Sequence, residues 1–140
     1  MADLILAIEQ LLRARVLFDA LKRRNLDMDS KEYVNTIGKT MGSVNEALGI
    51  LNSYITDFEI LLSGTLDVEH REWLAGLRRD LLNIRDVFVI DFTRSQNSQK
   101  LVDAARDLKT VYDRWSKLRA ELLLQSQLKP ALQAIVRKAA

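Results

Sequence analysis

The sequence has no cysteine and little histidine, proline or glycine: one His, one Pro and five Gly among 140 residues. Without cysteine the chain can form no disulfide, no thiolate metal site and no cysteine nucleophile. Its one histidine, His70, cannot supply a metal site that needs two imidazole ligands. So few glycines and prolines leave little material for the many tight turns of an all-β fold. We therefore expect an all-α protein without metal or cofactor, and we do not expect an enzyme.

Long hydrophobic runs are also missing. The opening stretch MADLILAIEQLL is apolar, but Asp3 and Glu9 interrupt it, and it has neither a basic leader nor a small-residue cleavage site. The longest apolar runs are far shorter than the ~20 residues needed to cross a bilayer. We expect a cytoplasmic protein.

What the sequence does have is apolar residues at alternating steps of three and four. This spacing is typical of helices that bury one stripe. It predicts helices at residues 2–24, 30–63, 66–92 and 98–125, followed by a short helix at 127–139. The second helix has the most regular stripe, which consists of Val34, Ile37, Met41, Val44, Leu48, Leu51, Ile55, Phe58 and Leu62.

Polar residues and glycine indicate where these helices begin and end. Asp29 and Glu32 have capping-box spacing, which makes Asp29 the candidate N-cap of the second helix. Gly64 is expected to end that helix, because glycine tolerates the left-handed conformation after a last turn. Thr65 or Asp67 is expected to cap the third helix.

Three glycines lie inside the second predicted helix, and two of them, Gly38 and Gly42, are four residues apart. Each costs about 1 kcal/mol relative to alanine in a helix. Their spacing gives one nearly flat face that a neighbouring element could approach closely. The simpler interpretation, which we favour, is that a long and well-packed helix tolerates them.

Connections of about three to six residues force successive helices to run antiparallel. The sequence therefore predicts one domain over residues 1–140, an elongated up-down-up-down four-helix bundle with a short C-terminal fifth helix. The alternative is a long helical hairpin that completes its core by dimerising.

Three partial matches to known sites fail on ligand number or position. A di-iron bundle needs two Glu-x-x-His pairs, whereas here Asp67 stands three residues before the only histidine. A calcium loop beginning at Asp27 would need glycine at Glu32 and glutamate at Gly38. Residues 38–40 mimic the end of a phosphate-binding loop, but no glycine precedes them. We expect His70 to be a partly exposed residue near one end of the bundle.

Charge is unevenly distributed, although the formal net charge is only +2. Residues 26–93 carry 12 acidic and 6 basic side chains, a net −6, and the rest of the chain carries 7 acidic and 15 basic side chains, a net +8. The first and fourth helices are neighbours in an up-down bundle, so we predict a basic side. This candidate basic face comprises Arg13, Arg15, Arg23, Arg24, Arg106, Arg114, Lys117, Arg119, Arg137 and Lys138.

The candidate basic face has three interpretations. It could dock a protein partner, or a second copy, of opposite charge. It could track the phosphates of RNA or single-stranded DNA. The acidic and basic helices could also simply attract each other within one molecule. We favour a non-enzymatic protein–protein interaction or assembly module, an adaptor or small subunit of a complex, with nucleic-acid binding as the alternative.

A second candidate surface is apolar. The stretch 87–90 is apolar on every side and is either a buried helix end or a surface patch that a partner covers. We predict an exposed apolar patch made by Val89, Ile90, Leu132, Ile135 and Val136. Association with a membrane surface through the first or fifth helix ranks last among the functions considered. No small-molecule substrate is evident.

Overall fold

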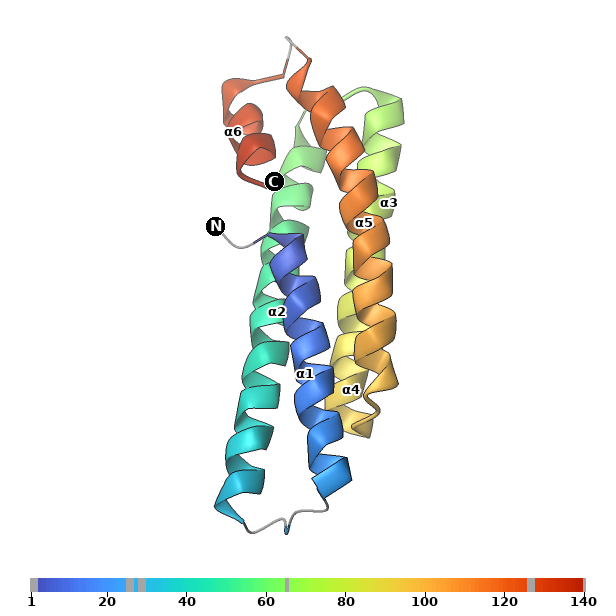
Figure 1. Cartoon of the computed structure of the whole chain (residues 1–140). Coiled ribbons are helices and arrows are strands. Elements are labelled where there is room, and N and C mark those ends of the chain that lie inside the picture. The colour runs from blue at the N-terminus through green and yellow to red at the C-terminus, as the bar shows by residue number, and fades with distance from the viewer. Residues whose placement is uncertain (1–2, 25–26, 28–29, 65, 126–127, 140) are drawn as a thin grey trace.

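The computed structural model of the chain is all-helical (Figure 1). It describes residues 3–24, 27, 30–64, 66–125 and 128–139, and this part of the chain contains no strand. The elements are α1 (Leu4–Arg24), α2 (Lys31–Ser63), α3 (Val68–Asn83), the π-helical segment η1 (Ile84–Val89), α4 (Ile90–Ser95), α5 (Gln99–Leu123) and α6 (Pro130–Lys138). The all-α prediction is thereby confirmed for the described residues.

The long helices lie side by side along one axis (Figure 1). α1 contacts α2 and α5, whereas α3 and η1 contact α2 and α5 from the other side. Figure 1 shows α2 running against α1, and α5 running against the segment from α3 to α4. The short helix α6 contacts α5 and α2 near the ends of both. These neighbours are compatible with the up-down order expected from the short connections.

One apolar core runs along this assembly, and aromatic side chains fill it at two levels. Phe58 and Trp115 pack with ring centroids 4.7 Å apart, and Phe18 and Phe92 form an edge-to-face pair at 5.3 Å. All four side chains are buried. Such pairs add about 0.5–1.5 kcal/mol to the free energy gained by burial.

The predicted stripe of α2 is only partly buried. Ser30 is the N-cap, and its hydroxyl accepts a hydrogen bond from the backbone N–H of Tyr33; Asp29 lies outside the described residues. Val34 was expected in the stripe but is 58% exposed, and the first buried residue of α2 is Thr40. Figure 1 gives the reason, since the beginning of α2 and the end of α1 extend beyond α4 and the start of α5.

The helix predicted at 66–92 begins at Val68, is capped by Asp67 and contains a π-helical turn at Ile84–Val89. A π turn adds one residue to the helical repeat. The buried stripe therefore steps by five residues, from Ile84 to Val89, and Phe88, which a regular step of four from Ile84 would place in the stripe, is half-buried.

The predicted exposed apolar patch is wrong for three of its five members. Val89 and Val136 are fully buried and Leu132 is 7% exposed, while Ile90 and Ile135 are half-buried. Its two parts also lie far apart, because α4 and α6 are near opposite ends of the molecule (Figure 1). In the stretch 87–90 only Val89 is fully buried, whereas Val87 is 44% exposed and the other two residues are half-buried. The helix α6 turns its apolar side inward.

Gly64 ends α2 as expected, but not for the expected reason. Its φ of −85° is not left-handed. A Cβ atom built there would overlap Cδ1 of Leu132, the buried leucine of α6. A larger residue at this position would therefore require the Leu132 side chain to move.

Candidate functional site

The candidate basic face is distributed over three helices: four of its residues lie on α1, four on α5 and two on α6. α1 and α5 are in contact, as the prediction of one basic side requires. The structure therefore brings the α1 and α5 residues onto neighbouring helices, whereas the α6 residues lie at one end of the molecule (Figure 1).

Five of the ten basic side chains pair with carboxylates of the same chain. Two of these five side chains pair within their own helix: Arg15 with Asp19 at 3.1 Å on α1, and Arg106 with Asp103 and Asp107 at 3.6 and 3.4 Å on α5. Three join a basic helix to an acidic one: Arg24–Glu32, Arg114–Asp80 at 3.6 Å, and Lys138–Asp57 at 3.9 Å. Attraction between oppositely charged helices thus uses part of the face.

Arg119 donates hydrogen bonds to the end of α6 and is therefore not an available surface cation. Its Nε donates a hydrogen bond to the carbonyl of Val136 at 2.8 Å, and its Nη2 donates to the carbonyl of Arg137 at 3.0 Å. The indole Nε1 of Trp115 donates to the carbonyl of Ala139. Because the last carbonyls of a helix have no partner within it, these two α5 side chains cap α6.

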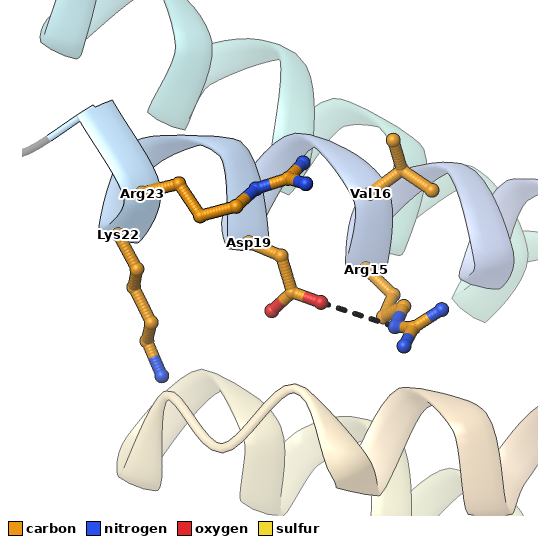
Figure 2. Close-up of a pocket in the computed structure, with 5 residues that line it drawn as sticks. All are labelled: Arg15, Val16, Asp19, Lys22 and Arg23. Carbon is orange, nitrogen blue, oxygen red and sulfur yellow. Dashed lines mark ion pairs between the residues drawn. The ribbon is translucent and has the colours of Figure 1, made fainter.

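The remaining members, Arg13, Arg23, Lys117 and Arg137, form no ion pair with any described residue. Arg23 lines a pocket of about 440 Å³ together with Arg15, Val16, Asp19 and Lys22 (Figure 2). All five residues belong to the second half of α1. In Figure 2 the Lys22 side chain extends away from α1 toward the neighbouring ribbon, and the Arg23 side chain lies along α1.

The outer face of α1 also exposes two large apolar side chains, one turn apart. Leu12 is 41% exposed and Val16 is 57% exposed. They lie opposite the stripe that α1 buries in the core, namely Leu4, Ala7, Leu11, Ala14, Phe18 and Leu21. Sequence reasoning missed both residues and Lys22 as site candidates. The sequence does contain a signal for this pair: Leu12 and Val16 are four residues apart, and they lie on the side of the helix away from the regular apolar stripe.

His70 joins the first turn of α3 to the last turn of α5. Its Nε2 lies 2.8 Å from Oε2 of Glu121, and its Nδ1 lies 2.9 Å from Oδ2 of Asp67. The expectation of a partly exposed residue is confirmed, since the side chain is 13% exposed. Burial of the imidazole favours its neutral form, but the Glu121 hydrogen bond and the two carboxylate charges outweigh burial and raise the pKa of His70. The hydrogen bond from the backbone N–H of His70 lowers the pKa of Asp67.

Two polar side chains are buried where α2 approaches the start of α1 and α6. Burial, reinforced by the nearby charge of Asp3, raises the pKa of Tyr54 to about 12, so the phenol is neutral at physiological pH. Asp57 is 6% exposed, and its Oδ2 has no hydrogen-bond partner among the described residues. Its other oxygen faces Lys138. The Asp57–Lys138 pair thus joins α2 to the last residue of α6.

A smaller pocket of about 210 Å³ lies between α3 with η1 and α5. Its polar lining residues are Asp80, Asn83, Asp107 and Thr110. Asp80 pairs with Arg114, and Asp107 with Arg106. Both carboxylates are thus already engaged by arginines.

Two kinds of site are absent from the described residues. Within these ranges no three His, Asp or Glu side chains are grouped so that they could hold a metal ion. No helix in the described part is long and apolar enough to cross a membrane. Comparison with protein-family models, curated proteins and solved structures gave no match to the chain.

Proposed function

We propose that the protein is a non-enzymatic protein–protein interaction or assembly module, built as an elongated up-down-up-down helical bundle, and that it binds through the outer face of α1. The observation that carries the proposal is the exposure of Leu12 and Val16, one turn apart on that face. A partner that covers both side chains gains the free energy of apolar burial, about 25 cal/mol per Å².

The charges around this pair favour an acidic partner. Arg13 and Arg23 lie on the exposed side of α1 and have no ion pair among the described residues. Unpaired surface charges steer association and suppress partners of like charge. A protein with carboxylates around a small apolar patch, or the acidic side of a second copy, meets both requirements.

The test is site-specific photo-crosslinking in the native host. A photoreactive residue at Val16 should yield a defined adduct, and Leu12→Glu in the same chain should abolish it. The matched control is a photoreactive residue at Val68, which is 72% exposed at the start of α3. Equal adducts at both positions, or an adduct that Leu12→Glu leaves unchanged, contradict the proposal. The adduct mass distinguishes a second copy from another protein.

The nucleic-acid alternative receives less support from the geometry. Tracking a phosphate backbone needs a continuous row of available cations. Here five of the ten basic residues pair with carboxylates, and Arg119 is engaged by backbone carbonyls. The four others are divided among α1, α5 and α6. A membrane role for α6 is also disfavoured, because its apolar side packs on α5 and α2.

A further inference from the structure

The pocket on the second half of α1 is lined by three cations and one acid; Figure 2 shows Arg15 beside Asp19, Lys22 extending away from α1 and Arg23 lying along it. Arg15, Lys22 and Arg23 contribute three positive charges, and Asp19 contributes one negative charge, which leaves a local charge of +2. The surface pairs Arg78–Glu59 and Lys109–Asp113, by contrast, each join one base to one acid and are close to neutral. The pocket thus has an excess of positive charge that no described residue neutralises.

Two of the three cations are held in place by neighbouring side chains. Nε of Arg15 lies 3.1 Å from Oδ2 of Asp19, one turn further along α1. Nζ of Lys22 lies 4.9 Å from the centre of the Phe18 ring, and that ring is itself fixed in the core against Phe92. Ordering these two side chains on ligand binding therefore costs less conformational entropy than it would at an ordinary basic surface. Arg23 is the only one of the three without such a partner among the described residues.

We infer that this pocket binds a phosphate monoester, with the phosphate held by Arg15, Lys22 and Arg23. A phosphate monoester carries about −1.5 to −2 charges at neutral pH, which matches the local charge of +2. Its three free oxygens accept several hydrogen bonds, and arginine guanidinium groups match that geometry well. A carboxylate has half the charge and fewer oxygens.

Val16 indicates that the ligand has an organic part. Its side chain lines the same pocket and is 57% exposed, so a carbon group attached to the phosphate can rest on it. The volume of about 440 Å³ falls within the range of about 300–1,000 Å³ for small-ligand sites. A free sugar or glycerol phosphate and the headgroup of a phosphatidic acid share this chemistry. Binding of such a ligand needs no protein partner, but the pocket shares Val16 and Arg23 with the surface proposed to bind a protein, so the two partners would compete for these residues.

The test is an NMR titration of the full-length chain at low ionic strength, with amide shifts of α1 as the readout. The probes are inorganic phosphate, glycerol phosphate and acetate. We expect saturable shifts around residues 15–23, tightest for glycerol phosphate and several-fold weaker for acetate. Lys22→Gln and Arg23→Gln should each weaken binding about three- to tenfold, and the double variant should abolish measurable binding.

Two further variants make the result specific. Arg13→Gln removes an unpaired cation of the same helix that does not line the pocket, so it should leave binding unchanged within about twofold. Asp19→Asn raises the local charge to +3 and should tighten phosphate binding about three- to tenfold. If Arg13→Gln weakens binding as much as Lys22→Gln does, or if Asp19→Asn weakens it, the inference is wrong. Absence of saturable shifts overturns it as well.

An experiment with lipid vesicles distinguishes the two sources of the phosphate, a soluble phosphate ester and a lipid headgroup. Flotation with phosphatidylcholine vesicles that contain phosphatidic acid should recover the protein if the ligand is a lipid headgroup, and Lys22→Gln with Arg23→Gln should prevent recovery. Binding of glycerol phosphate without recovery on these vesicles identifies a soluble ligand. If the double variant is recovered with the vesicles as fully as the original chain, another surface contacts the membrane. The conclusion that the pocket binds a lipid headgroup is then wrong.

Discussion

The two ends of the molecule differ in how firmly their helices are joined. At the end that carries α6, Trp115 and Arg119 cap its last carbonyls, and His70 joins α3 to α5. At the opposite end, α2 has no buried residue before Thr40, and the Arg24–Glu32 ion pair joins α1 to α2. Both ends have regular apolar spacing in the sequence. The difference shows that regular apolar spacing does not by itself place a stripe in the core, because burial also needs another element to cover it.

The largest effect is expected at Trp115, which is fully buried at the α6 end. Trp115→Ala removes its packing on Phe58 and the hydrogen bond to the carbonyl of Ala139. We expect a loss of about 3–5 kcal/mol in the free energy of unfolding, measured by urea denaturation. Trp115→Phe keeps most of the packing and loses only the N–H donor, so it should cost about 1–2 kcal/mol. A loss below about 1 kcal/mol for Trp115→Ala would falsify this view of the α6 end.

Glycine-to-alanine substitutions should have opposite signs at the two ends. At Gly64 the new Cβ overlaps Cδ1 of Leu132, so this buried side chain must leave its present position, at a cost of about 1 kcal/mol. At Gly42 no atom lies within 4 Å of the new Cβ, and alanine is the better helix former. Gly42→Ala should therefore stabilise the protein by about 0.5–1 kcal/mol. Thermal unfolding of both variants decides this, and a change of the same sign in both contradicts it.

His70 should make the α6 end sensitive to pH. Its pKa is raised in the folded protein, so its contribution to stability is fully present below the unfolded pKa of about 6.5 and is lost as pH rises through the folded pKa. The free energy of unfolding should therefore fall as the pH rises from about 6.5 through the raised folded-state pKa of His70. His70→Gln should flatten this part of the profile. An unchanged slope in the variant would show that the Asp67–His70–Glu121 contacts do not join α3 to α5.

The positions of the helices were largely predictable from the sequence, whereas the structural roles of several residues were not. Periodicity located α1, α2 and α5 to within a few residues because the core covers one stripe of each helix. The π turn was not predictable, because an added residue in the helix leaves no local sequence signal and shows only when Val89 replaces Phe88 in the core. The role of Gly64 depends on Leu132, which is distant in sequence.

The candidate basic face was predictable as a set of charges, but not as a site. Sequence reasoning placed Arg15 and Arg23 on it and omitted Lys22, because only the folded chain shows Lys22 over Phe18 and lining the α1 pocket. It included Arg119, whose hydrogen bonds to α6 follow from tertiary contacts between residues 17 and 18 positions apart. Which cations remain available depends on pairing between helices, and pairing between helices is set by packing.

The smallest effect is expected at Val34, at the end of the molecule opposite α6. Val34 and Val44 both belong to the apolar stripe that the sequence predicts for α2, but Val34 is 58% exposed and Val44 is fully buried. Val34→Ala should change the free energy of unfolding by less than about 0.5 kcal/mol, because little apolar area is lost. Val44→Ala is the matched control and should cost about 1.5–3 kcal/mol. Equal losses in urea denaturation would mean that another surface, such as that of a second copy, covers Val34 in solution. The hairpin-dimer alternative would then regain support over a bundle whose α2 begins beyond its neighbours.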